Sequence, residues 1–267
     1  MIFCRTRGRG LGMWVAAVVA LLVLAPTPVL ADASPAVRMS APSGQILDAM
    51  LAVEARDSGT VSAQFLGTRY GADTLVGSAD QDEQLVVELE RVDCFTYADY
   101  VEALKRADDR ETFLAGLTDV RYTNGVVAFD NRRHFFTDWA AADPAVATDV
   151  TGSVSDDAVR TSKQLNRKDT GGVYLPGLPV VAREVSFIPS DQVDGGVISR
   201  LRTGDYLGAY ALDGGLDVTH VGLFVDSPTG PVFRHASSLP SEMAVVDTPL
   251  ADYLATVPGV VVLRPVR

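Results

Sequence analysis

A single cysteine dominates the chemistry that this sequence offers. Of the two cysteines, Cys4 lies near the amino terminus and Cys94 lies where an apolar run gives way to a helical pattern. From Cys94 onward, Ala98, Val101 and Leu104 recur at three-to-four-residue spacing, which predicts a helix with one apolar face. Free backbone N–H groups and the helix dipole at such a start favour the thiolate, the nucleophilic form. We therefore expect Cys94 to be a nucleophile; the alternative is a small buried core residue.

Two of the three histidines are placed to assist a nucleophile. His220 and His235 lie on apolar-rich runs that flank a turn signal at residues 227–230, which predicts an antiparallel hairpin. In that hairpin the two histidines are expected almost opposite each other on one sheet face, with Cβ atoms roughly 5 Å apart. A base that takes the thiol proton and a second group that orients the base need this arrangement. The sequence thus predicts a catalytic set of Cys94, His220 and His235.

The segment 131–139 packs two arginines, a histidine and three aromatic residues together. Such a cluster suits a wall that stacks on a sugar and pairs with a carboxylate. We predict that Arg133, His134 and Trp139 contact substrate, together with Tyr70 from a glycine-bounded turn upstream of the cysteine. The alternative is a surface loop that Trp139 anchors into the core.

The elements that must position these residues predict an α+β domain. Helical patterns begin at a Ser43 cap, at Cys94 and at Asp109, and a turn and strand are expected over residues 121–129. Short Val/Leu/Tyr/Phe-rich runs then predict strands at 205–212, 219–226, 231–236 and 260–263. Helices followed by strands are typical of a helical layer packed on an antiparallel sheet.

The domain boundaries follow from composition. Residues 32–43 are rich in Pro, Ser and Ala and are expected to be a disordered lead-in. Residues 44–267 are expected to form one domain. The polar, Gly- and Pro-rich stretch 143–183 reads as an elaboration carried on that domain, because it shows no apolar pattern of its own.

The amino terminus predicts export. Residues 1–31 combine three arginines, an apolar stretch at 11–24 and a small-residue cleavage region ending at Ala31, as a secretory signal does. The apolar stretch is short for a membrane span, so no stable span is expected after cleavage. Because the segment carries three arginines and no acid, its removal changes the net charge from −11 to −14. So acidic a surface disfavours nucleic acid as a partner. We expect a periplasmic or extracellular monomer.

Export makes the cysteine informative, because disulfides persist in oxidising compartments and cysteines there are usually paired. Cys94 is the sole cysteine of the predicted mature chain. A chain of this length buries a full core without disulfides. An unpaired exported cysteine is a liability or a reactive group.

Four motifs together resemble the NlpC-type, papain-like cysteine peptidases of the bacterial cell wall. Within that superfamily the chain is most similar to the N-acetylmuramoyl-L-alanine amidase-like branch. The motifs are Asp-Cys-x-Thr at 93–96, Arg-x-His-aromatic-x-x-Asp-Trp at 132–139, Gly-Leu-Asp-x-x-His-Val-Gly at 215–222 and His-Ala-Ser-Ser at 235–238. The resemblance runs from about residue 44 to the carboxyl terminus. The run after Thr96 and the stretch 143–183 depart from the family pattern.

The resemblance implies a papain-like (NlpC-type) fold and thiol chemistry without a metal or other cofactor. In it Cys94 is the nucleophile, His220 the base and His235 the third member. The substrates implied are peptidoglycan fragments, namely muramyl peptides cut between the muramyl group and L-alanine. Asp205, at the head of a predicted strand, is expected to cap or pair with an arginine.

Three alternatives remain open at this point. A relative of the same superfamily could cut between D-glutamate and the diamino acid of the stem peptide. A zinc amidase would use the histidines as ligands, although the sequence has no close-spaced pair such as His-x-x-x-His. A non-catalytic module would bind the cell wall through the same scaffold.

Overall fold

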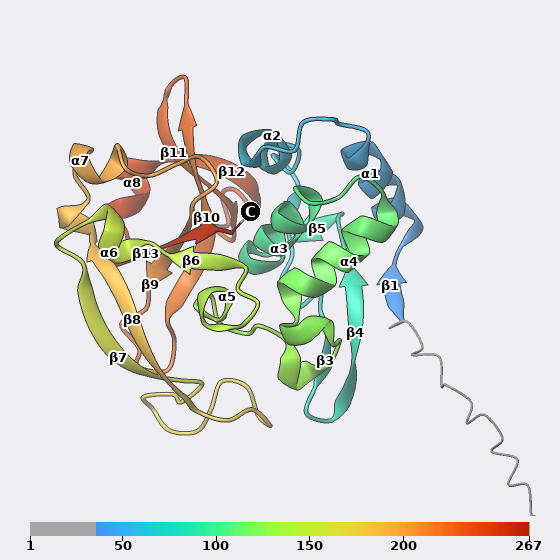
Figure 1. The fold of residues 1–267 in the computed structure, drawn as a ribbon, viewed down its shortest axis with the longest axis horizontal. Helices are drawn as coiled ribbons and strands as arrows, with labels where there is room; N and C mark the ends of the chain where they lie inside the picture. The colour runs from blue at the N-terminus through green and yellow to red at the C-terminus, as the bar shows by residue number, and fades with distance from the viewer. Residues whose placement is uncertain (1–35, 267) are drawn as a thin grey trace, which may run out of the picture. The chain divides into compact units, whose positions relative to one another are not determined.

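The structure, a computed structural model, describes residues 36–266 of the chain (Figure 1). The predicted signal segment 1–31 lies outside the described residues. Across residues 36–266 no helix has the length and apolar character needed to cross a bilayer. The fold is a mixed α+β arrangement in which a long curled sheet lies beside a group of helices.

Ten strands of the described chain form the larger sheet. Their order is β5-β2-β12-β11-β10-β9-β13-β8-β7, and β6 pairs with β13 outside this path. All of its neighbouring strands pair antiparallel except β2 and β5, which are parallel. The bounds are β2 Arg69–Tyr70, β5 Arg91–Val92, β6 Ala147–Asp149, β7 Val159–Leu165, β8 Val181–Pro189, β9 Tyr206–Tyr210, β10 Val218–Ser227, β11 Gly230–Ser237, β12 Ala244–Pro249 and β13 Gly259–Pro265.

Three further strands form a small sheet in the order β1-β4-β3. β1 (Val37–Met39) pairs in parallel with the end of β4 (Gln81–Val87), and β3 (Val76–Ser78) pairs antiparallel with β4. The end of β4 belongs to the apolar run that precedes Cys94. The chain then passes through β5 into the helix that begins at Cys94.

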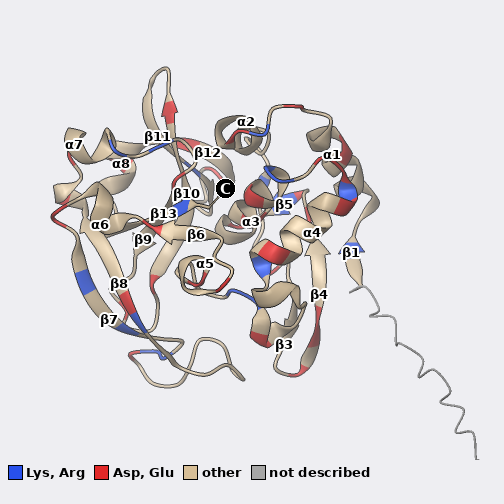
Figure 2. Cartoon of the chain, in the orientation of Figure 1, with Lys and Arg blue, Asp and Glu red and all other residues tan. Residues whose placement is uncertain are grey.

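Helices α3 (Cys94–Leu104) and α4 (Arg110–Arg121) pack against each other, and α3 also packs on β10 and β11. Each begins with a capping box in which an aspartate, Asp93 or Asp109, binds first-turn N–H groups and a threonine binds back. Figure 2 shows both signs of charge on α4. The other helices are α1 Ala41–Leu51, α2 Ser58–Ala63, α5 Asp138–Ala141, α6 Thr151–Val154, α7 Gly195–Ile198 and α8 Leu250–Leu254, with single 3₁₀ turns at Thr123–Gly125, Phe129–Asn131 and Ser190–Gln192.

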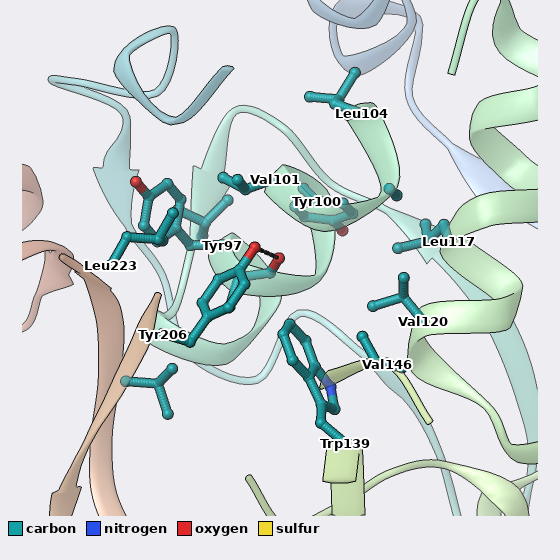
Figure 3. Close-up of a cluster of buried hydrophobic side chains, with 14 of the residues drawn as sticks. Tyr97, Tyr100, Val101, Leu104, Leu117, Val120, Trp139, Val146, Tyr206 and Leu223 are labelled. Carbon is teal, nitrogen blue, oxygen red and sulfur yellow. Dashed lines mark hydrogen bonds between the residues drawn. The ribbon is translucent and has the colours of Figure 1, made fainter. Parts of the chain in front are cut away.

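The main core lies between α3 and the sheet. Trp139 of α5 is fully buried and meets Tyr206 of β9 edge to face, with ring centroids 4.9 Å apart (Figure 3). Tyr206 in turn donates to the buried carboxylate of Glu102 on α3 at 3.1 Å. The Glu102 carboxylate forms ion pairs with Lys105 and Arg106. This packing fixes the position of α3 relative to the strands that carry the histidines.

The helix at Cys94 and the hairpin around residues 227–230 are confirmed, and the α+β class with them. The lead-in predicted over 32–43 is wrong at its end, because residues 37–39 cover the edge of β4 and α1 starts at Ala41. The cap of that helix is Ser40 rather than Ser43. Ser40 Oγ accepts from the N–H of Ser43, and a proline in the first turn suits a helix start.

The strand predicted within residues 121–129 is also wrong. Arg121 is instead the last residue of α4, and its buried guanidinium pairs with Asp99 of α3 at 2.7 Å. The chain then reverses through Asn124 and Gly125, both at positive φ. The stretch 143–183 contributes β6, α6, β7 and the start of β8, so much of it belongs to the large sheet.

Candidate active site

Cys94 occupies the first position of α3, beside the cap residue. The Asp93 carboxylate accepts from the N–H groups of Phe95 (3.0 Å) and Thr96 (2.7 Å), and the Thr96 hydroxyl accepts from the Asp93 N–H (3.0 Å). As a residue Cys94 has intermediate exposure, and it is not in a disulfide. Because Asp93 uses two of the first-turn donors, the N–H of Cys94 itself is the one left for a developing oxyanion.

The two histidines of the hairpin are in direct contact. His220 Nε2 lies 2.8 Å from His235 Nδ1, and the two rings are almost perpendicular. His235 Nε2 lies 3.0 Å from the hydroxyl of Thr248 on β12. If His220 Nε2–H donates to His235 and His235 Nε2–H donates to Thr248, then His220 Nδ1 carries a lone pair and acts as an acceptor. This chain of tautomers gives His220 the form that a base requires.

In the hairpin, His220 and His235 are two positions away from the nearly direct opposition that was expected. Leu223 faces Arg234 and Ser227 faces Gly230 across the two-residue turn, so His220 is a diagonal neighbour of His235 and not its direct partner. In the adjacent β9 the partner of His220 is Ala209, next to an irregularity in the pairing. The two residues still share a sheet face, because a shift of two positions preserves the side of the strand.

The thiol is not pre-ionised, contrary to the expectation from its helix-start position. Burial, with a smaller contribution from the Asp93 carboxylate, raises the pKa of Cys94 to about 12. The nearby N–H groups of Val221, Cys94 and Phe95 act in the opposite direction but are outweighed. The free protein therefore holds a neutral thiol near pH 7, and its proton must leave as the sulfur attacks.

The histidines are neutral as well. Burial first, and the neighbouring His235 second, lower the pKa of His220 to about 3. Burial lowers the pKa of His235 to about 4, while Asp247 opposes the shift. Both rings can thus accept a proton, although the dry surroundings make the resulting cation costly unless a thiolate or an oxyanion lies beside it.

A pocket of about 240 Å³ brings Cys94, His220 and His134 together. His235, at 4% exposed, stands behind His220 and does not line it. His134 is held by a 2.7 Å contact between its Nε2 and the Phe129 carbonyl, and burial lowers its pKa. The remaining lining is mostly apolar and comprises Phe95, Phe135, Phe136, Tyr174, Leu175, Leu216, Asp217, Val218, Thr219 and Val221.

Of the other predicted contacts, Tyr70 is near Cys94 but does not line its pocket, and the buried Arg133 and Trp139 do not line it either. Tyr70 pairs with Val92, and burial, followed by smaller electrostatic contributions from the Cys94 and Asp93 side chains, raises the pKa of its phenol. Arg133 is 3% exposed and donates to carbonyl groups at the end of α4 and to that of Pro144. Trp139 is fully buried, as the alternative of a core anchor predicted. The predicted substrate contacts of Arg133 and Trp139 are therefore wrong for the pocket that holds Cys94.

Sequence reasoning missed several residues around the histidines and the pocket. Thr248 lies on β12, a strand that was not expected, and binds His235. Tyr253 of α8 stacks on Phe233, with centroids 4.1 Å apart, and lies beside both histidines. Tyr174 and Leu175 come from the Gly- and Pro-rich stretch, where no periodicity marks them.

Asp205 was expected to cap or to pair with an arginine, and its carboxylate forms an ion pair with Arg264 at 2.7 Å.

Among the described residues no three His, Cys, Asp or Glu side chains are grouped to hold a metal ion.

Comparison with known proteins places the chain in a family. Residues 60–260 match the model of the AmiA-like family, described as N-acetylmuramoyl-L-alanine amidase-like. The chain belongs to this family. The description of the family gives the chain a coarse functional class, that of a peptidoglycan amidase-like hydrolase. No functionally curated protein is significantly similar to the chain in sequence.

Solved structures agree with the amidase-like assignment. A Bacteroides uniformis structure, titled an N-acetylmuramoyl-L-alanine amidase, is 26% identical over 80% of this chain and all of its own, with a TM-score of 0.66. A second structure under the same title is 25% identical over 84% of this chain and all of its own, with a TM-score of 0.64. A Legionella pneumophila protein, 22% identical over 85% of this chain and 95% of its own, shares the fold with a TM-score of 0.68.

Proposed function

We propose that this protein is a thiol-dependent N-acetylmuramoyl-L-alanine amidase that hydrolyses the muramyl–L-alanine amide of peptidoglycan fragments in the periplasm or outside the cell. The observation that carries the proposal is the 2.8 Å contact between His220 and His235, with His220 and Cys94 lining one pocket. A cysteine at a helix start that faces a sheet histidine is the arrangement of papain-like cysteine peptidases. The amidase-like family supplies the substrate class.

The reaction begins with a proton transfer. His220 Nδ1 accepts the thiol proton as Cys94 Sγ attacks the lactyl carbonyl, and the N–H of Cys94 donates to the oxyanion that forms. His235, with Thr248 behind it, holds the His220 ring and delocalises the new positive charge. Since both rings are neutral at rest, the cation forms only when the sulfur and the oxyanion carry the compensating negative charge.

The second half of the reaction regenerates the thiol. His220 gives its proton to the amine of L-alanine as the C–N bond breaks, which leaves a thioester between Cys94 and the muramyl lactyl group. Neutral His220 then takes a proton from water, and the hydroxide attacks the thioester. Collapse of this intermediate returns the proton to the sulfur and releases N-acetylmuramic acid.

The choice of the muramyl–alanine bond is supported by the charge of the pocket. No lysine or arginine is among the residues that line it. A pocket that held the stem peptide would face the free carboxylate of D-glutamate, and carboxylates near a buried site need a cationic partner. The N-acetylated sugar is uncharged around its ring and suits these apolar walls.

Mass analysis of the products tests the proposal. Purified muramyl peptides should yield N-acetylmuramic acid and an intact stem peptide that begins with L-alanine, while free stem peptides stay uncut. Cys94→Ala should release neither product, with a free energy of unfolding within about 1–2 kcal/mol of the parent.

Other products would decide among the alternatives. Cleavage between D-glutamate and the diamino acid would replace the amidase by the endopeptidase. Chelator-sensitive turnover that survives alkylation of Cys94 would favour a zinc enzyme. Binding of muramyl peptides without any turnover would leave a wall-binding module.

A further inference from the structure

The loop between β7 and β8 forms one wall of the catalytic pocket. It covers residues 166–180 and lies at the lower edge of Figure 1, where it extends from the sheet. Tyr174 and Leu175 of this loop line the same pocket as Cys94 and His220. The loop thus belongs to the site, although it shares no element with the nucleophile or the base.

One side chain holds the loop in place. Asn166 is fully buried, and its side-chain amide donates to the carbonyls of Leu175 (3.1 Å), Leu178 (2.9 Å) and Pro179 (3.3 Å). Its side-chain carbonyl accepts from the N–H of Leu175 at 2.7 Å, and its backbone carbonyl accepts from the N–H of Tyr174 at 2.9 Å. Four side-chain hydrogen bonds from one buried residue make a rigid pin.

The base of the loop is tied to the connection that leads into β10. The N–H of Asn166 donates to the Gly215 carbonyl at 2.9 Å, and Asp169 accepts from the N–H of Gly214 at 3.1 Å. A Cβ on Gly215 would lie 1.9 Å from the Arg167 carbonyl oxygen, so only glycine permits this approach. The loop is therefore positioned relative to the strand that carries His220.

The loop adds apolar and aromatic surface to a pocket that lacks cationic lining. One face of the Tyr174 ring lies near Lys168, whose Nζ is 5.2 Å from the ring centroid. Aromatic rings and aliphatic side chains bind the C–H faces of sugars, whereas a stem peptide rich in carboxylates would need cations.

We propose that the loop 166–180, pinned by Asn166, forms the subsite for the N-acetylated sugar on the acyl side of the scissile amide, with Tyr174 and Leu175 as its contacts. This inference rests on the proposed amidase function. It makes the loop the element that selects a muramyl acyl group over a shorter one.

Two substrates separate this subsite from catalysis. A muramyl peptide and a lactyl peptide carry the same amide and the same stem, but the second has no sugar. Tyr174→Ala should lower the ratio of kcat/KM for the muramyl peptide to that for the lactyl peptide about tenfold, equivalent to about 1.4 kcal/mol. Asn166→Gly should lower the same ratio, because glycine keeps the positive φ of residue 166 but removes the four side-chain hydrogen bonds.

Asn124→Gly is the matched control. Asn124 also has a positive φ, is exposed, and makes no side-chain hydrogen bond to the described residues. Its substitution should leave the ratio and the melting temperature as in the parent. Direct binding provides a second readout, since the primary amide of N-acetylmuramic acid, which has no free lactyl carboxylate, should bind Cys94→Ala about tenfold more tightly than it binds Cys94→Ala/Tyr174→Ala.

An unchanged ratio together with unchanged binding of the N-acetylmuramic acid amide would overturn the subsite while the amidase function stood. A parent protein that releases no stem peptide from muramyl peptides would instead overturn the proposed function, and the binding measurement would still decide the subsite.

Discussion

The neutral histidine pair should make the folded chain lose stability in acid. An unfolded histidine titrates near pH 6.5, whereas in the fold the pKa is about 4 for His235 and about 3 for His220. As the pH falls below 6.5, the histidines of the unfolded chain bind protons that those of the folded chain do not bind. The free energy of unfolding therefore falls until the pH reaches the folded pKa. From pH 7 to 4.5 this linkage amounts to about 2 kcal/mol for one histidine.

His235→Asn isolates the effect. Asparagine has no proton to titrate in this range, and its amide can still bind His220 and Thr248. Urea unfolding at several pH values should show that the variant loses about 2 kcal/mol less than the parent between pH 7 and 4.5. The carboxylates that also titrate in this window are common to both chains and cancel in the difference.

Thr248→Val is the control, because it removes the hydroxyl that binds His235 but keeps the titrating ring. It should retain the acid sensitivity of the parent. Equal losses in the parent and in His235→Asn would refute the reasoning, since they would mean that His235 is already protonated in the fold near pH 6.5.

Three further outcomes follow from the contacts. His220→Asn should abolish release of stem peptide, whereas His235→Asn should retain part of it, because an amide can still orient the base; equal and complete loss would mean that His235 does more. Trp139→Ala should lower the free energy of unfolding by about 3–5 kcal/mol, and calorimetry should show a reduced melting temperature, because a fully buried ring is removed. Asp99→Ala should cost about 3–5 kcal/mol in denaturant unfolding, since it strands a buried guanidinium, while removal of the exposed Asp48 carboxylate should cost far less.

The parts of the site that could be predicted are those with local signals. The helix at Cys94 follows from the three-to-four-residue spacing of its apolar residues, and the hairpin follows from the turn signal at residues 227–230. These features depend on neighbours in sequence. The side of the sheet shared by His220 and His235 was predictable for the same reason, although they are diagonal neighbours and not directly opposite.

The parts that could not be predicted depend on distant packing. The pKa of Cys94 is set by burial beneath other elements, which outweighs the helix-start effect that the sequence reveals. The arginine and tryptophan of 131–139 looked suited to substrate because their types are, but burial decides their role. Arg133 caps the carbonyl groups that end α4, and Trp139 fills the core next to Tyr206.

The burial of Arg133 changes the argument about specificity. A guanidinium in the pocket would have held the carboxylates of the stem peptide, and the sequence favoured an amidase partly on that ground. With Arg133 donating to backbone carbonyls, the pocket that holds Cys94 has a mostly apolar lining without lysine or arginine. The muramyl group suits that lining better than a charged peptide does, and the loop pinned by Asn166 supplies the missing wall. The choice of the muramyl–alanine bond therefore rests on a pocket whose lining has no lysine or arginine, and not on the Arg133 contact expected from the sequence.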